Sequence, residues 1–172
     1  MTLGSHQRSV GISQTHITPK WILDALGPFD LDPCAADPRP WDCAAVNFTE
    51  ADDGLGRSWQ GRVWLNPPFD RYRVAAWIQR MADHGNGMAL LHARTETEWF
   101  RICWHHADAI LFMAPRITFH RTDGSLCTTR NGEHANSGAP PVLVAFGSED
   151  AVRLHDFTEK HGGALVENWW SP

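Results

Sequence analysis

An asparagine, two prolines and a phenylalanine follow a short apolar run in this sequence, and they form its most distinctive chemical motif. The apolar composition of residues 62–65 predicts a strand, and Asn66, Pro67 and Pro68 directly follow its end. Two successive prolines fix the backbone and remove two N–H donors, so the loop offers carbonyl acceptors to a ligand. Asn66 adds a side-chain carbonyl, and Phe69 adds a flat apolar face. This set suits a planar heterocycle that carries an exocyclic amine.

The reaction that these residue types favour is methyl transfer to such an amine. The lone pair of an adenine N6 nitrogen is delocalised into the ring, which makes the amine a poor nucleophile. The Asn66 amide oxygen and the Pro67 carbonyl can accept both amine protons, so that the nitrogen becomes more tetrahedral and attacks a sulfonium methyl group in line. Phe69 would stack on a base flipped out of a nucleic-acid helix. The competing interpretation is a Pro-Pro strand terminator that follows an asparagine without a role.

The segment before this loop predicts one helix and one strand. Residues 18–27 favour a helix that Thr18 caps, with Pro19 in its first turn. Residues 29–32 alternate in polarity and run into a proline, which is typical of a strand followed by a loop. Residues 36–60 are rich in Pro, Asp and Gly, so we expect them to be mostly irregular and the helix after the first strand to be reduced.

Downstream of the loop, apolar periodicity predicts two more helices and three more strands. The helices cover residues 73–84 and 95–106, and Thr95 with Glu98 makes a capping-box pattern at the start of the second. The strands cover residues 88–91, 109–113 and 141–146. Strands that alternate with helices imply a mainly parallel sheet covered on both faces.

The chain of 172 residues is long enough for one domain with a substantial core. We expect residues 13–172 to form a single α/β domain of compact, Rossmann-like architecture, and residues 1–12 to be a flexible or vector-derived N-terminus. No run of 18 apolar residues and no signal-peptide pattern occurs, so we expect a cytoplasmic protein without membrane contact. The four cysteines form no CxxC pair, and we expect no metal site.

The charge distribution separates two parts of the chain. The formal net charge of −5 argues by itself against a nucleic-acid binder. However, residues 24–54 contain eight acidic residues and one arginine, whereas residues 57–130 contain ten arginines and six acidic residues. The first segment repels phosphate and the second attracts it, as in an enzyme with separate cofactor and DNA surfaces.

Several short motifs occur in a fixed order between Thr18 and Phe146. They are Thr18-Pro19, Phe29-Asp30-Leu31-Asp32-Pro33-Cys34-Ala35, Asp53-Gly54-Leu55, the run from Gly61 to Phe69, Arg94-Thr95-Glu96-Thr97 and the run from Pro115 to Phe119. In this order they resemble the phage-type DNA N6-adenine methyltransferase family of small Dam-like enzymes. The resemblance implies a methyltransferase fold, S-adenosylmethionine as the cofactor, and methylation of adenine N6 in double-stranded DNA of a bacterial host. It makes Asn66-Pro67-Pro68-Phe69 the catalytic loop.

The resemblance also assigns the first cofactor motif. Asp32, Pro33, Cys34 and Ala35 match the motif that holds the methionine end of S-adenosylmethionine at the tip of the first strand. A carboxylate suits this place because the α-ammonium group needs an anionic partner. This chain lacks the usual Gly-x-Gly, since Cys34-Ala35-Ala36 stands in its place.

Further cofactor contacts are implied on either side of that motif. Thr18 and Pro19 resemble the N-terminal motif in which a helix start approaches the methionine carboxylate. Glu50 or Asp53 is expected to accept hydrogen bonds from the ribose hydroxyls or the adenine amine of the cofactor.

We expect the DNA contacts to come from arginines that follow the catalytic loop: Arg94, Arg116, Arg121 and Arg130. The polar, glycine-bearing segment 118–140 is the candidate target-recognition loop, because a loop of this length in a compact domain tends to be functional. The competing interpretation of these arginines is a solvated helix cap and surface salt bridges, and that of the segment is a cover over the core.

Two other classes of function stay open on the sequence alone. An Asn-Pro-Pro-aromatic loop also suits methylation of RNA or of a protein glutamine. A catalytically inactive DNA-binding or anti-restriction module would need no such loop, and the intact Asn66, Pro67 and Phe69 argue against it. The sequence specifies neither the DNA recognition site nor the choice between monomer and homodimer.

Overall fold

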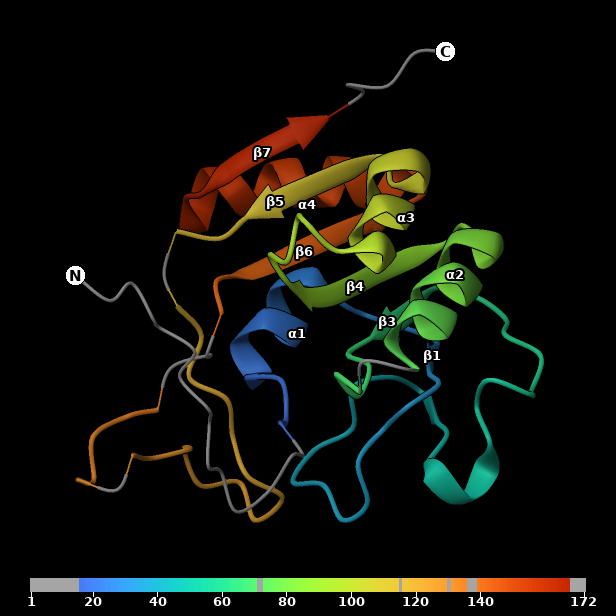
Figure 1. Ribbon diagram of the computed structural model, residues 1–172. Coiled ribbons are helices and arrows are strands. Elements are labelled where there is room, and N and C mark those ends of the chain that lie inside the picture. The colour runs from blue at the N-terminus through green and yellow to red at the C-terminus, as the bar shows by residue number, and fades with distance from the viewer. Residues whose placement is uncertain (1–15, 71–72, 115, 130, 136–138, 168–172) are drawn as a thin grey trace.

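A seven-stranded sheet with helices on both faces organises the chain (Figure 1). The computed structural model describes residues 16–70, 73–114, 116–129, 131–135 and 139–167, so the expected flexible segment 1–12 lies outside the described residues. The strands are β1 (Leu31–Asp32), β2 (Val46–Asn47), β3 (Val63–Leu65), β4 (Gly87–His92), β5 (Ala109–Phe112), β6 (Pro141–Phe146) and β7 (Ala164–Glu167). The helices are α1 (Lys20–Leu26), the 3-10 helix η1 (Glu50–Asp52), α2 (Val74–His84), α3 (Glu98–His106) and α4 (Ser148–His161).

The sheet is mixed, which corrects the prediction of a mainly parallel sheet. Its strand order is β2-β1-β3-β4-β6-β5-β7. In the described part of the chain three neighbouring pairs are parallel (β1–β2, β1–β3, β3–β4) and three are antiparallel (β4–β6, β5–β6, β5–β7). The prediction was wrong because the connection from β5 to β6 contains no helix in its described residues. The chain therefore returns between β4 and β5 in the opposite direction.

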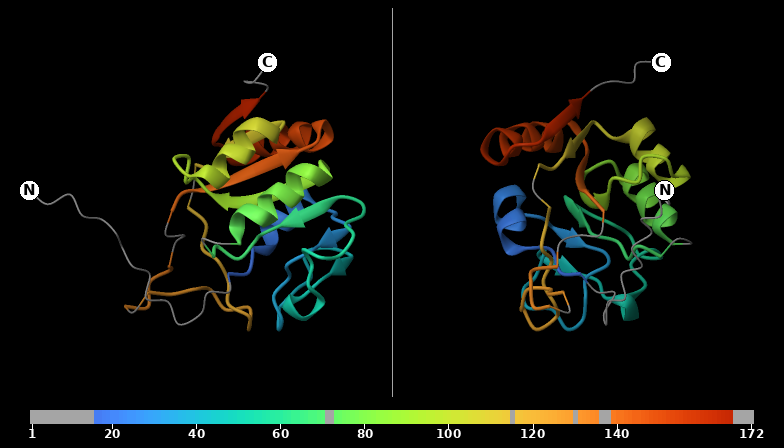
Figure 2. Two further views of the ribbon diagram at one scale, coloured as in Figure 1. Left: turned by 45° about the vertical axis from the view of Figure 1, so that its right-hand side comes forward. Right: turned by 60° about the vertical axis from the view of Figure 1, so that its left-hand side comes forward.

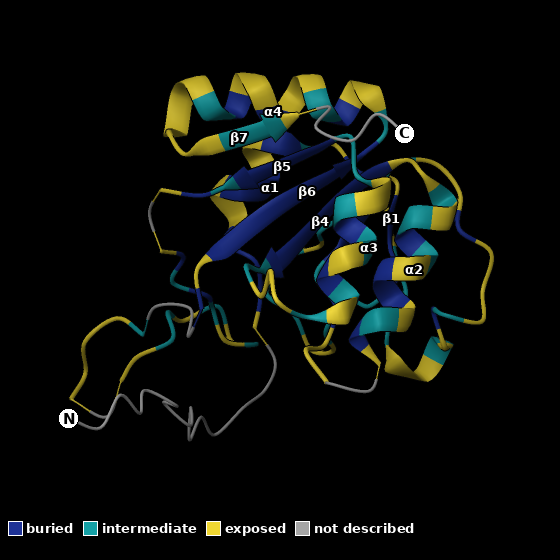
Figure 3. Ribbon diagram, turned by 45° about the horizontal axis from the view of Figure 1, so that its top comes forward, coloured by how far each residue is buried: buried dark blue, intermediate teal, exposed yellow. Residues whose placement is uncertain are grey.

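Each face of the sheet carries its own apolar layer. Helices α1 and α4 cover one face, and α2 and α3 cover the other (Figure 2). Side chains alternate along β3 and β4: Trp64, Met88 and Leu90 pack with α1 and α4, whereas Val63, Leu65, Ala89 and Leu91 pack with α2 and α3. All residues of β6 are buried, and all of β4 except His92, so these two strands form the centre of the core (Figure 3).

Local sequence signals explain the end of α2 but not the starts of α1 and α3. Gly85 adopts the left-handed conformation that closes α2, as the predicted helix end requires. The start of α3 differs from the prediction: Thr97 rather than Thr95 is its cap, and the Thr97 hydroxyl accepts a hydrogen bond from the Phe100 backbone N–H. Helix α1 begins after Pro19 without a side-chain cap, so Thr18 is not a cap either.

The region after β1 is as irregular as expected. Residues 33–45, all of which the structure describes, contain no helix, and only the single turn η1 lies between β2 and β3. Helix α4 and strand β7 were not predicted from the sequence. None of the described helices is long and apolar enough to cross a membrane.

One buried ion pair ties the start of β3 to α4. The Arg62 guanidinium contacts the Asp150 carboxylate through Nε at 2.7 Å and Nη2 at 2.5 Å, and only 2% of the Asp150 side chain is exposed. The same guanidinium donates to the Pro28 carbonyl and stacks over Phe29 at 4.1 Å from the ring centre. Arg62 thus joins three segments that lie far apart in the sequence.

Removing the carboxylate of this pair should be costly. Asp150→Ala leaves a largely buried guanidinium without its counter-charge, and we expect the free energy of unfolding to fall by about 3–5 kcal/mol. Urea unfolding measures this difference. The control is Asp24→Ala, which removes the partner of Lys20 in an exposed pair and should cost about 1 kcal/mol or less. Similar losses in both variants would contradict the structural role of the Arg62–Asp150 pair.

Candidate active site

The ends of three neighbouring parallel strands bring polar side chains to one edge of the sheet. Asp32 ends β1, Asn66 follows β3, and His92 ends β4. These strands pair in the order β1-β3-β4, with Leu31 opposite Val63 and Leu65 opposite Ala89. The carboxyl edge of parallel strands is where α/β sheets bind ligands.

The Asn66 side chain is fixed by the segment that precedes α1. Its Nδ2 donates to the His16 carbonyl oxygen at 2.9 Å and to the Thr18 hydroxyl oxygen at 3.2 Å. Its backbone carbonyl oxygen accepts from the Cys34 thiol at 3.4 Å. Asn66 therefore joins the N-terminal segment, the loop after β1 and the end of β3.

The remaining residues of the loop present an aromatic face. Pro67 is buried, whereas Pro68 and Phe69 are exposed. The Phe69 ring stacks on the His92 ring with centroids 4.0 Å apart and planes at 15°. Burial lowers the pKa of His92 to about 4, with smaller contributions from the charges of Arg94 and His16. His92 is therefore neutral at pH 7, and the stack is one of two uncharged rings.

Asp32 is a buried carboxyl in the loop next to Asn66. It accepts a hydrogen bond from the Cys34 backbone N–H at 3.0 Å, and the thiols of Cys34 and Cys43 also interact with it. Burial raises the pKa of Asp32 to about 6, although these hydrogen bonds and the charge of Arg39 oppose the shift. Burial also raises the thiol pKa values of Cys34 and Cys43, so both act here as neutral donors.

A close backbone approach places the turn after β2 against this loop. A Cβ atom at Gly54 would lie 1.9 Å from the Pro33 carbonyl oxygen, so only glycine fits there. The preceding Asp53 adopts the left-handed conformation at the end of η1. Asp53 and Glu50 are both exposed, whereas Pro33 and Ala35 are buried.

The candidate target-recognition segment packs beside the N-terminal segment. Ile17 and His120 form a β-bridge with N···O distances of 3.0 and 3.1 Å. Trp41, from the loop after β1, meets the His120 ring edge-on at 5.0 Å, and its Nε1 donates to the Thr18 carbonyl oxygen at 3.1 Å. Figure 1 shows this segment (yellow to orange) below the sheet, on the same side as the loop after β1.

The arginines assigned to DNA are exposed where the structure describes them. Arg94 lies in the turn after β4, Arg116 lies between β5 and the candidate segment, and Arg121 lies within that segment, where it donates to the Thr128 hydroxyl. Arg130 lies outside the described residues. Part of the segment covers the core, because Phe119 is buried.

The sequence matches a family model over most of its length. The model, described as DNA N-6-adenine-methyltransferase (Dam), covers residues 12–161. The chain belongs to this family. A comparison with curated proteins finds no match.

Membership of the Dam family confirms the resemblance seen in the motifs and implies DNA adenine N6-methyltransferase activity, with use of S-adenosylmethionine in general. Its match spans both the loop at Asn66 and the acidic motif at Asp32.

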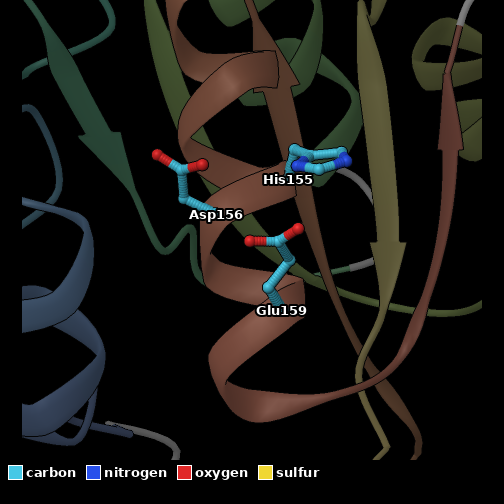
Figure 4. Close-up of side chains that lie close together, drawn as sticks. All are labelled: His155, Asp156 and Glu159. Atoms are coloured by element: carbon cyan, nitrogen blue, oxygen red, sulfur yellow. The ribbon is translucent and has the colours of Figure 1, made fainter.

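A second cluster of polar side chains lies on α4. His155, Asp156 and Glu159 lie together there, with their ligand atoms within 4.8 Å of one another (Figure 4). All three are exposed, and such groups are common on protein surfaces without a metal ion.

Sequence reasoning missed two side chains of this candidate site. His92 stacks on Phe69, and Trp41 contacts both Thr18 and His120. The position of His92 directly after the predicted strand 88–91 was an available signal, because Asn66 stands in the same relation to its own strand. No sequence signal indicates the contacts of Trp41, which join residues far apart in the chain.

The Phe69–His92 stack has a measurable consequence. Phe69→Ala should open the imidazole to water and raise the pKa of His92 from about 4 toward 6.5. Phe69→Tyr keeps the ring and should keep the low pKa. NMR titration of the histidine signals measures both values, with His92→Gln to assign the resonance. An unchanged pKa in the alanine variant would mean that Phe69 does not shield His92.

Proposed function

We propose that this protein transfers a methyl group from S-adenosylmethionine to the N6 amine of adenine in double-stranded DNA, acting on a base flipped out of the duplex. The Dam-family match supports the reaction class. The geometry at Asn66 supports the assignment of the loop Asn66-Pro67-Pro68-Phe69 as the catalytic loop.

The orientation of the Asn66 amide is the observation that carries this proposal. The Nδ2 atom donates to the His16 carbonyl and to the Thr18 hydroxyl, which both lie on the N-terminal segment. The Oδ1 atom therefore faces away from that segment and can accept a proton of the substrate amine. The Pro67 carbonyl is the second proposed acceptor, and the exposed Phe69 ring is the stacking surface for the flipped adenine.

The cofactor site is proposed next to this loop. S-adenosylmethionine, when bound, supplies a sulfonium methyl group as the electrophile. Asp32 fits its methionine end, because a buried carboxyl with a raised pKa gains most from a nearby ammonium group. We assign the methionine end to Pro19 and residues 32–35, and the ribose hydroxyls or adenine amine to Asp53 or Glu50. The close approach of Gly54 to Pro33 supports this grouping, since it brings the η1 turn to the same loop.

DNA is proposed to lie across the exposed arginines near the strand ends. Arg94, Arg116 and Arg121 are exposed, and Arg130 belongs to the same proposal although it lies outside the described residues. The segment 118–140 is proposed to recognise the target sequence. Its β-bridge to Ile17 supports this role, since Ile17 lies between the two residues that bind the Asn66 amide.

Asn66→Ala is the direct test of the reaction. Loss of a preorganised acceptor of this kind costs on the order of 10²–10³ in kcat. We expect that loss with an affinity for S-adenosylhomocysteine within a few-fold of the wild type, because the amide acts on the substrate amine. Nucleoside mass spectrometry of digested duplex DNA quantifies N6-methyladenine, and calorimetry measures the affinity.

Asn86→Ala is the matched control, because Asn86 precedes β4 at the opposite edge of the sheet and should leave turnover unchanged. Turnover near the wild-type value in Asn66→Ala would refute the mechanism. Label transfer from tritiated S-adenosylmethionine to RNA or to protein, but not to DNA, would refute the substrate. Cofactor binding without transfer to any of them would favour an inactive DNA-binding module.

The raised pKa of Asp32 predicts a pH dependence of cofactor binding. Below about pH 6 the carboxyl is protonated and offers no charge to the ammonium group, so affinity should fall by about tenfold for each pH unit. Above pH 6 it should level off. Calorimetry with S-adenosylhomocysteine between pH 5 and 7 covers this range, in which an α-amino group stays protonated.

Two variants separate this effect from a general loss of structure. Asp32→Asn should bind weakly at every pH and lose the dependence. Asp53→Asn should keep the dependence, because its exposed side chain is proposed to contact another part of the cofactor. A wild-type affinity that is constant between pH 5 and 7 would place the ammonium group elsewhere.

A further inference from the structure

The function proposed for Asn66 depends on which end of its amide faces the substrate. An amide can present either its oxygen or its NH₂ group, and rotation about the Cβ–Cγ bond exchanges the two. In this site the hydrogen-bonding partners of the amide determine which of the two orientations it adopts. The His16 carbonyl, at 2.9 Å, can only accept a hydrogen bond, so the atom that faces it must be the nitrogen.

Thr18 is the second acceptor, and it is almost completely buried. Only 1% of Thr18 is exposed, and its hydroxyl oxygen lies 3.2 Å from the Asn66 Nδ2. Its own carbonyl oxygen accepts from the Trp41 indole, and its neighbour Ile17 is bridged to His120. Contacts from separate segments therefore hold the backbone at Thr18, and burial of the residue restricts its side chain.

We propose that Thr18 is a positioning residue whose hydroxyl accepts a hydrogen bond from the Asn66 Nδ2 and thereby holds Oδ1 toward the adenine amine. This inference rests on the proposed function. It differs from the expectation that Thr18 contacts the methionine carboxylate of the cofactor. A hydroxyl that accepts from Nδ2 can still donate to a carboxylate, so the affinity measurements below separate the two roles.

Loss of the hydrogen bond between Thr18 and Asn66 should lower kcat. With only the His16 carbonyl left to hold it, the amide samples other rotations, and Oδ1 spends less time in the productive place. Misplacement of a catalytic group by small amounts costs up to about 10²-fold. We expect kcat to fall by about 10- to 100-fold in Thr18→Val, with little change in the affinity for S-adenosylhomocysteine.

Two matched pairs of variants isolate the hydroxyl. Thr18→Val has the shape of the wild-type residue without the acceptor, and Thr18→Ser keeps the acceptor. Thr18→Ala and Thr18→Ser differ by the hydroxyl alone, so this pair serves if the valine variant does not fold. For each we would measure kcat on duplex DNA at saturating cofactor, calorimetric affinity for S-adenosylhomocysteine, and the unfolding midpoint.

A readout without turnover comes from the side-chain amide signals of Asn66 in the ligand-free protein, assigned by their absence in Asn66→Ala. Thr18→Val should shift one of the two amide protons and speed its exchange, whereas Thr18→Ser should not. A low kcat in the valine and alanine variants, rescue by serine and unchanged affinity would support the proposal.

Three results would overturn it. A valine variant with unchanged kcat and unchanged amide signals would show that the hydroxyl has no positioning role. A weakened affinity with unchanged kcat would assign Thr18 to the cofactor instead. Equal losses in the serine and valine variants would indicate a packing role only. If the wild type methylates no DNA, the proposed function fails, whereas the amide signals still test the contact between Thr18 and Asn66.

Discussion

The parallel pairing of β1, β3 and β4 is the constraint on which the site depends. Parallel strands in register end at one edge, so Asp32, Asn66 and His92 meet although 60 positions separate the first from the last. Residues before and after these strand ends then complete the site. The buried layers on both faces of the sheet hold this register, because a slip by one residue would reverse every side chain.

A short segment before α1 links the proposed catalytic and recognition elements. His16 and Thr18 bind the Asn66 amide, while Ile17 between them pairs with His120. Trp41 adds the loop that follows Asp32 to the same contacts. The elements proposed to bind cofactor, base and target sequence therefore share side-chain and backbone contacts. A conformational change in one of them would directly alter its contacts with the others.

The fold was predictable where local signals are strong. Buried strands, the helix α2 and its glycine cap followed from periodicity and turn chemistry. The direction of β6 did not, because strand pairing is decided by contacts far apart in the chain, and a long connection without a helix permits an antiparallel return. Thr95 and Thr97 are equally good caps by residue type, and in the structure the Thr97 hydroxyl accepts from the backbone N–H of the buried Phe100.

By itself the sequence determined the reaction class, since its ordered motifs, which include Asn66 and Asp32, resemble the Dam family and the family match confirms this resemblance. Tertiary structure alone decided the pKa of Asp32 and the orientation of the Asn66 amide. Burial of Asp32 raises its pKa, and the His16 carbonyl fixes which end of the Asn66 amide faces outward. Desolvation and hydrogen-bond direction both depend on neighbours that fold into place from distant segments, and no local pattern encodes them.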